Sequence, residues 1–290
     1  MMKASAPGRR QVKKQLFWQH VNPLSESYQK PADLDEDWLH SNFQYPQKPF
    51  YIDLGCSEGG FCLQMAQHNP MINFLGLEIK PSLVTAANRM KEEKGLRNVY
   101  FIAANANVDI KRIMKDINQI SLTQRVCIQF PDPHIKRKHM KRRMVTKRLI
   151  SEISSELKDE GEIFTQCDLK LVAEYMHEIL RSEETLVDAR EMNLRLPGAS
   201  DDGQKDDWFL NTSFHSVPTE RETFVRTTSS RGRKKVIYKS LFCKKAPLLL
   251  IGDDSAEEYH YNNTKLAGSS KQEDCGNDGK NVCNIFCLLS

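Results

Sequence analysis

Short apolar runs alternate with segments of helical spacing along the middle of this chain. The runs are rich in β-branched or aromatic residues, which favour strands, and they cover residues 50–54, 73–77, 99–103, 125–130 and 162–166. Apolar residues between the runs recur at intervals of three and four, which favours amphipathic helices. This repeated order predicts an α/β fold, with a mostly parallel sheet and helices on both faces.

The same pattern continues toward the end of the chain. Residues 171–181 have the spacing of a further helix, and residues 185–189 and 236–242 have the composition of strands. Between these strands, residues 196–216 are rich in Gly, Asp, Ser and Asn, which predicts a long surface loop. Loops of this length inside a compact domain are usually functional.

The two ends of the chain differ in composition from its middle. Residues 1–49 begin basic and then become rich in Pro, Asp and aromatic residues, which predicts a mobile arm followed by an irregular lead-in. Residues 246–290 are acidic and polar, which predicts a disordered tail. The expected organisation is one folded domain over residues 50–245 with an appendage on each side.

The net charge of +4 combines two unlike parts. Seven acidic and three basic side chains lie in residues 246–290, so residues 1–245 carry a net charge of +8. A cationic body is typical of proteins that bind polyanions. Hydrophobic content of 39% and charged content of 28% are ordinary for a globular protein, and no apolar run reaches the ~20 residues of a membrane span.

The eight cysteines form no pattern that indicates a metal site. They include no Cys-x-x-Cys pair and no histidine at zinc-site spacing, so buried or free thiols are expected and no metal is predicted. The basic N-terminus has no apolar core segment, so no secretory signal is predicted. We expect a cytoplasmic or nuclear protein, with the plastid as the alternative.

Three polar sites follow three of the predicted strands and together suggest a nucleoside pocket. The turn Asp53-Leu54-Gly55 follows the first, where glycine lets the backbone approach a ligand closely. Glu78 ends the second run and suits the two hydroxyls of a ribose, while Asn105 ends the third and suits an adenine amino group. Because the G-x-G-x-x-G fingerprint is absent, adenosine without phosphates fits better than a dinucleotide. For Gly55 alone, a plain tight turn before a helix is the alternative.

A fourth site follows the fourth predicted strand. Asp132 stands between Pro131 and Pro133, which restrict the backbone, so it is expected to be a fixed acceptor for a base edge. A run of cations without an acidic residue follows it. Such a run is usually a solvated helix face, but on a cationic body beside a predicted site it favours phosphate binding. Its members are Lys136, Arg137, Lys138, Lys141, Arg142, Arg143, Lys147 and Arg148.

The segment Thr219-Glu220-Arg221-Glu222 lies between the predicted loop and the last predicted strand. Considered alone, it predicts a capping box or an exposed turn.

Taken together, these motifs resemble those of the tRNA (guanine-N7-)-methyltransferase family over residues 15–245. The sequence departs from the family pattern at Ser57, where glycine is usual, at His134, where an aromatic residue is frequent, and at Asp159-Glu160-Gly161, where Pro-Gly-Gly is common. The resemblance rests on Asp53-Leu54-Gly55, Gly76-Leu77-Glu78, Asn105-Ala106, the run from Phe130 to His139 with Lys141-Arg142-Arg143, Asp168, and Thr219-Glu220-Arg221-Glu222.

The resemblance implies a Rossmann-like class I methyltransferase with a mostly parallel seven-stranded sheet. It implies S-adenosylmethionine as cofactor, bound by a methyltransferase domain over residues 50–245, and tRNA as substrate. The methyl group would go to N7 of a guanosine in the variable loop. Residues 19–24 are similar to the lead-in of the cyanobacterial and plastid-like branch. That branch implies an enzyme that acts alone, rather than with the β-propeller partner subunit that is common among eukaryotic members.

By the same resemblance, Asp132 is expected to be the catalytic acid. Because guanine N7 already carries a lone pair, we expect Asp132 to position the base rather than to remove a proton. The cofactor would contact Asp53 or Gly55, Glu78, Asn105 and Ala106, and the guanosine would contact Lys136, Asp168, Thr219, Glu220, Arg221 and Glu222. From the charge pattern, the phosphate-binding residues would be Lys138, Lys141, Arg142 and Arg143.

Two other functions stay open. A methyltransferase acting on a small molecule or a protein would not explain the basic run. A non-catalytic RNA-binding relative would not explain why Glu78, Asn105 and Asp132 occur together.

The last four residues, Cys287-Leu288-Leu289-Ser290, fit a C-a-a-X box for farnesylation, and Cys283 could accept a second lipid. A chance match is the alternative. A single lipid would give only weak membrane association.

Overall fold

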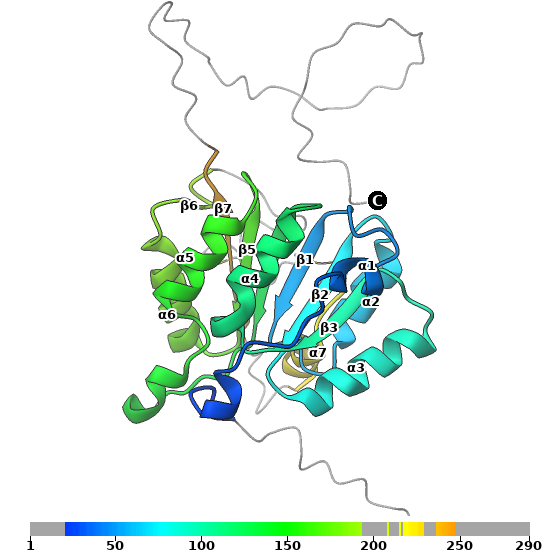
Figure 1. The fold of residues 1–290 in the computed structure, drawn as a ribbon. Coiled ribbons are helices and arrows are strands. Elements are labelled where there is room, and N and C mark those ends of the chain that lie inside the picture. Colours follow the sequence, from blue (N-terminus) through cyan, green and yellow to red (C-terminus); the bar gives the residue numbers. More distant parts are fainter. Residues whose placement is uncertain (1–20, 193–207, 209–214, 216, 229–235, 247–290) are drawn as a thin grey trace, which may run out of the picture. The chain divides into compact units, whose positions relative to one another are not determined.

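The computed structural model describes residues 21–192, 208, 215, 217–228 and 236–246. In this part of the chain, seven strands form one sheet in the order β3-β2-β1-β4-β5-β7-β6 (Figure 1). β7 is antiparallel to both of its neighbours, and the other neighbouring pairs are parallel. The strands are β1 (Phe50–Leu54), β2 (Asn73–Glu78), β3 (Val99–Ala103), β4 (Thr123–Gln129), β5 (Glu162–Cys167), β6 (Leu186–Asp188) and β7 (Tyr238–Lys244).

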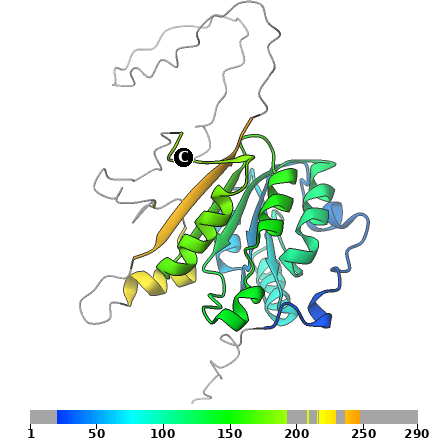
Figure 2. The ribbon, with the colours of Figure 1, turned by 90° about the vertical axis from the view of Figure 1, so that its left-hand side faces the viewer.

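Helices cover both faces of this sheet, as Figures 1 and 2 show from two sides. One face carries α4, α5 and α6 together with the short helix α1 of the lead-in. The other face carries α2 and α3. The helices are α1 (Trp38–Asn42), α2 (Gly60–His68), α3 (Pro81–Glu93), α4 (Ala106–Asn118), α5 (Lys147–Glu156), α6 (Lys170–Arg181) and α7 (Glu220–Thr227), with 3-10 turns η1 (Glu26–Tyr28) and η2 (Arg137–Arg142).

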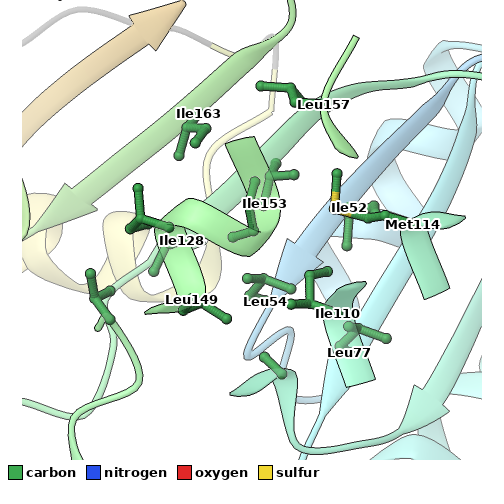
Figure 3. Packing of buried hydrophobic residues seen from close by; sticks show 14 of the residues in the cluster. Ile52, Leu54, Leu77, Ile110, Met114, Ile128, Leu149, Ile153, Leu157 and Ile163 are labelled. Atoms are coloured by element: carbon green, nitrogen blue, oxygen red, sulfur yellow. The ribbon is translucent and has the colours of Figure 1, made fainter. Parts of the chain in front are cut away.

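The larger apolar core lies between the central strands and helices α4 and α5. Figure 3 shows Ile110 of α4 and Ile153 of α5 among the side chains of Ile52 and Ile128, which come from β1 and β4. All four are buried, and burying a side chain of this size stabilises the fold by about 1.5–3 kcal/mol. Because helices cover both faces, most side chains on both faces of the central strands are buried.

The predicted α/β fold is confirmed. β1 and β3 have the predicted bounds, and β2, β4 and β5 differ from the predicted runs by at most two residues at either end. α6 coincides with the predicted late helix, and β6 and β7 fall where the two late strands were expected.

The lead-in contains structure that the sequence pattern did not reveal. α1 has five residues, too few to show a helical period, and its Trp38 and Leu39 lie in the larger core with Phe43. The folded body therefore includes part of the lead-in, which the expected boundary at residue 50 leaves out.

Two side chains of the predicted surface loop 196–216, buried Trp208 and half-buried His215, pack against the body. Trp208 is 5% exposed and lies 5.2 Å from His177, ring centroid to ring centroid. The ring of His215 lies 5.0 Å from each of Phe61 and Phe164, on the opposite face of the sheet. These contacts place two points of the segment against the body rather than on its surface.

The predicted basic arm falls in residues 1–20 and the predicted acidic tail in residues 247–290, both outside the described residues, as are Cys283 and Cys287. In the described part of the chain, no helix is long and apolar enough to cross a membrane.

Candidate active site

The predicted site residues gather at the carboxyl edge of the sheet. The strand order reverses at β1, which lies between β2 and β4, and such a switch point is where ligands bind in open α/β sheets. The turn η1 of the lead-in (blue), the turn η2 (green) and helix α7 (yellow) lie toward the lower end of the sheet in Figure 1. Segments far apart in sequence therefore surround one edge.

A turn of unusual backbone geometry joins β1 to α2. Gly55 and Gly59 have φ values of +79° and +74°, in the left-handed region that favours glycine. A Cβ on Gly59 would lie 2.4 Å from the ring of Phe101, so a side chain is also excluded by packing. Ser57 occupies the same region with φ 54°, where the family pattern has glycine. We call residues 55–60 the glycine turn.

Glu78 holds this turn in place from the end of β2. Its carboxylate accepts hydrogen bonds from the backbone N–H of Ser57 at 3.1 Å and of Lys80 at 3.0 Å. Burial raises the pKa of Glu78, and the negative charge of Asp132 contributes in the same direction. A carboxylate has about four acceptor positions, so two stay available for the paired hydroxyls of a ribose. Glu78 and the glycine turn therefore fit the nucleoside part of S-adenosylmethionine.

Asn105 joins α4 to the lead-in. Its Oδ1 accepts the backbone N–H of Asn107 and caps α4, and its Nδ2 donates to the carbonyls of Pro23 at 3.1 Å and Tyr28 at 3.0 Å. Both amide hydrogens are thus used within the protein. One acceptor position of Oδ1 is left, so Asn105 could accept a single hydrogen bond from an adenine amino group and has no hydrogen to donate to the ligand. Ala106, also predicted to contact the cofactor, is buried at the first residue of α4.

Asn107 makes a second junction at the same helix start. Its Nδ2 donates to the carbonyl of Met144 at 2.8 Å, and its Oδ1 accepts from the hydroxyl of Thr146 at 3.1 Å. Both partners lie just after the predicted phosphate-binding cations. The loop after β3 therefore contacts the lead-in on one side and the end of the basic run on the other.

Asp132 lies in the loop that leaves β4. The loop bends sharply at Phe130, which has φ 49° and whose N–H donates to the carbonyl of Gln166 at 2.8 Å. Asp132 itself is exposed, and its charge acts on buried Glu78. An exposed carboxylate near Glu78 is placed to meet a second substrate.

Residues 136–148, which we call the basic segment, form η2 and the start of α5. Lys136, Lys138 and Lys141 are exposed, and Arg142 is half-buried. These side chains are available to phosphates.

Arg143 differs from the rest of the basic segment and corrects the sequence interpretation. It is 7% exposed, its Nε donates to the carbonyl of Pro133, and its guanidinium lies 4.2 Å from the ring centroid of Tyr175. A side chain enclosed in this way does not reach a phosphate in solution. Its position indicates that it holds the Asp132 loop against α6.

Glu222 is also turned inward, contrary to the predicted substrate contact. Thr219 caps α7 by accepting the N–H of Glu222, while the Glu222 carboxylate accepts from Nζ of buried Lys239 at 2.8 Å and from Arg226. Burial alone would raise the pKa of Glu222, but the hydrogen bonds and positive charges of Lys239 and Arg226 together outweigh burial and lower that pKa. Glu222 therefore fixes α7 to β7.

The exposed start of α7 lies against the rest of the site. Arg221 pairs with Asp168, which follows β5, at 2.6 Å. A Cβ built on Gly60 would lie 2.7 Å from Oε1 of Glu220, which places this side chain at the glycine turn. The structure thus brings Glu220, Arg221 and Asp168 together with the predicted cofactor site.

Sequence reasoning missed a row of buried polar side chains beneath these loops. Nε2 of Gln129 donates to Oδ1 of Asp53 at 3.0 Å, and Nε2 of Gln166 donates to Oε1 of Gln129 at 2.7 Å. The Sγ of Cys62 also donates to Asp53. We call Asp53, Gln129 and Gln166 the strand-end row. Its signal in the sequence is a polar residue at the last or second-last position of each of the three strands β1, β4 and β5.

Comparison with known proteins decides the family. Residues 47–205 match the family described as "Putative methyltransferase". A tRNA (guanine-N(7)-)-methyltransferase of Nostoc sp. is 37% identical over 224 residues, which are 77% of this chain and 92% of that protein. The chain belongs to the tRNA (guanine-N(7)-)-methyltransferase family.

Other relatives in this family agree. The enzyme of Microcystis aeruginosa is 36% identical over 77% of this chain and 95% of its own length, and that of Thermosynechococcus vestitus is 40% identical over 57% and 74%. The family resemblance predicted from the motifs is therefore confirmed. Among solved structures, an rRNA methylase from Streptococcus thermophilus has a TM-score of 0.42 and 8% identity, covering 73% of this chain and 94% of that one.

Proposed function

We propose that this chain transfers the methyl group of S-adenosylmethionine to N7 of a guanosine in tRNA, in the variable loop. The observation that carries the proposal is the 37% identity that extends over 92% of a relative named for this reaction. The position of Asp132, Asp168 and the start of α7 at one edge of the sheet supports it.

Glu78 and the glycine turn are the residues we assign to the cofactor. Glu78 would accept the ribose hydroxyls, and Gly55 would let the backbone approach the ligand closely. When bound, S-adenosylmethionine supplies an electrophilic methyl group on a sulfonium. We assign Asp53 to the support of this turn rather than to direct contact, because its oxygens accept from Gln129 and Cys62.

Asp132 positions the guanine in this proposal. Its carboxylate accepts hydrogen bonds from the donor edge of the base and stabilises the positive charge that the ring gains when N7 is methylated. No proton has to be removed before N7 attacks, so alignment and electrostatics provide the rate enhancement. Lys136, the pair Asp168 and Arg221, and Glu220 would hold the rest of the nucleoside.

The exposed cations of the basic segment favour tRNA over a small molecule or a protein as substrate. Lys136, Arg137, Lys138 and Lys141 are exposed and follow Asp132 closely in the sequence, with no acidic residue from Pro133 to Ser151. Such a surface contacts the phosphates that flank a base drawn out of its stack. A non-catalytic RNA-binding protein would have no use for the Glu78 carboxylate at the glycine turn.

The experiment uses the purified full-length chain without any partner subunit. It is incubated with labelled S-adenosylmethionine and total tRNA, and the tRNA is then cleaved chemically at 7-methylguanosine. We expect label in tRNA and cleavage within the variable loop. Label without this cleavage would reject the N7 assignment, and activity only after a second subunit is added would reject independent action.

A further inference from the structure

The strand-end row lies directly beneath the loops of the candidate site. Asp53 is two residues before Gly55, Gln129 is three residues before Asp132, and Gln166 is two residues before Asp168. We propose that Gln129 is a positioning residue, whose amide sets the Asp132 loop against the glycine turn on one side and the end of β5 on the other. The inference depends on the proposed function only in taking methyl transfer to tRNA as the reaction that Gln129 supports.

The direction of the row follows from the chemistry of its members. An ionised carboxylate only accepts hydrogen bonds, so Asp53 requires the amino end of the Gln129 amide. The carbonyl end of Gln129 must then face β5, where it accepts from Nε2 of Gln166. Each amide is therefore held in a single orientation by its neighbour.

The Gln166 amide keeps this orientation although its carbonyl oxygen then accepts no hydrogen bond. Gln166 is 1% exposed, and its Oε1 has no hydrogen-bond partner among the described residues. Turning the amide would bring its amino group away from Gln129. A buried unpaired carbonyl costs about 1–3 kcal/mol. The two hydrogen bonds of the Gln129 amide, one to Asp53 and one from Gln166, therefore determine the arrangement.

The row extends toward the segment that contacts the substrate. Gln166 lies opposite Lys239 in the register of β5 and β7, and Nζ of Lys239 donates to Glu222 of α7. The backbone N–H of Phe130 donates to the carbonyl of Gln166, so the end of β4 is bonded to β5 through the Gln129 side chain and the Asp132 loop through its main chain. A displaced Gln129 would shift Asp132 relative to both neighbours.

Charged and titratable groups approach Gln129 from several elements. Asp53 of β1 accepts from Gln129 directly, while Cys62 of α2 and the charge of Glu78 of β2 act on Asp53. On the other side, Lys239 of β7 lies opposite Gln166 in the strand register and donates to Glu222 of α7.

Gln129→Met tests the proposal at nearly constant volume, because it removes both hydrogen bonds of the amide. A misplacement of about 1 Å can cost 10²-fold in rate, so we expect kcat to fall by about 10- to 100-fold. The basic segment is unchanged, so the Kd for tRNA should stay within about twofold. Binding of S-adenosylmethionine, measured by calorimetry, should weaken by about three- to tenfold because Asp53 loses a donor. Gln67→Met, on the exposed face of α2, is the matched control and should behave as the wild type.

Gln129→Glu tests the same proposal through the pH dependence of kcat, which a purely structural role of Gln129 would not change. Two neighbouring carboxyls share one proton at mildly acidic pH, and the protonated one can donate to Asp53 while its carbonyl accepts from Gln166. We expect kcat of this variant, relative to wild type, to rise at least about fivefold from pH 8.5 to pH 6 as the shared proton is bound. The kcat of Gln129→Met, relative to wild type, should be the same at both pH values.

The proposal is overturned if folded Gln129→Met keeps wild-type kcat, or if the Gln129→Glu ratio is the same at both pH values. Circular dichroism establishes folding, and the Glu variant at pH 6 carries the test if the Met variant does not fold. If the wild type fails to methylate tRNA, the proposed function is wrong. Cofactor binding by both variants at the two pH values then still decides whether the row supports the glycine turn.

Discussion

Asp53, one residue before the end of β1, is a buried carboxylate, and burial raises its pKa from 3.8 to about 6 in spite of hydrogen bonds from Gln129 and Cys62. The unfolded chain ionises this group near pH 4, whereas the folded protein keeps the proton until about pH 6. The free energy of unfolding therefore falls as pH rises from 4 to 6, and it stays lower above that window.

Asp53→Asn should accordingly stabilise the protein at pH 8, because the asparagine carbonyl still accepts from Gln129 without a buried charge. A shift of two pKa units limits the gain to about 3 kcal/mol, and we expect about 1–3 kcal/mol at pH 8 with little difference at pH 4. Urea denaturation at the two pH values measures it. An equal effect at both would mean that ionisation of Asp53 costs nothing in the fold.

Single residues differ in how well the sequence revealed them. Glu78 and Asp132 were predictable because each is an acid directly after an apolar run, where a parallel sheet places its ligand edge. Gln129 and Gln166 have no charge and no motif, so only the register of β4 and β5 brings them together. Arg143 looked like its neighbours because composition does not distinguish a buried cation from an exposed one.

At the scale of elements, the basic segment and α7 are the parts that would meet tRNA. Each Lys or Arg that neutralises a phosphate steepens the salt dependence of binding by about 0.7–0.9 in log–log slope. Replacing Lys138 and Lys141 with Gln should therefore reduce the slope by about 1.5 and weaken binding at low salt. Filter binding over a range of KCl concentrations measures this. The same change at Lys111 and Lys115 of α4 is the control, and a slope altered equally by both pairs would place the RNA elsewhere.

Arg143→Ala should lower the stability of the protein and leave tRNA binding unchanged, unlike the substitutions of Lys138 and Lys141. It removes a hydrogen bond to Pro133 and packing on Tyr175, so we expect a loss of about 1–3 kcal/mol in the free energy of unfolding. The salt slope of tRNA binding should not change. A slope reduced as much as by one of the lysines would restore Arg143 to the phosphate-binding set.

Helix α7 is the element that the sequence pattern could not distinguish from a turn. Val225 is its one buried apolar residue, and its inward face is completed by Glu222, so no apolar period is visible. Thr219 and Glu222 gave a capping signal, but a cap without a following apolar stripe does not distinguish a helix from a turn.

For the molecule as a whole, the lead-in shares the main core with the sheet. Trp38 is 3% exposed and its Nε1 donates to Asp116 of α4. Trp38→Ala should destabilise the protein by about 3–5 kcal/mol in one cooperative transition. Leu24→Ala, at a position 47% exposed, should change stability by less than about 0.5 kcal/mol. Chemical denaturation compares them, and a loss below 1 kcal/mol for Trp38→Ala would mean that the lead-in is not part of the cooperative unit.

The sheet was predictable from sequence because its central strands are buried on both faces and their apolar runs stand out against the helices between them. The strand order was not, since β7 reverses direction and enters between β5 and β6. Contacts that depend on this order, such as Lys239 with Glu222, require the structure.

The most direct test of the account is single-turnover methyl transfer to tRNA by Asp132→Ala, measured beside tRNA binding. The account predicts a rate reduced by at least about 100-fold, because the base is no longer aligned with the methyl donor, and a tRNA Kd within about twofold of wild type. Near-normal turnover in the folded variant would contradict it.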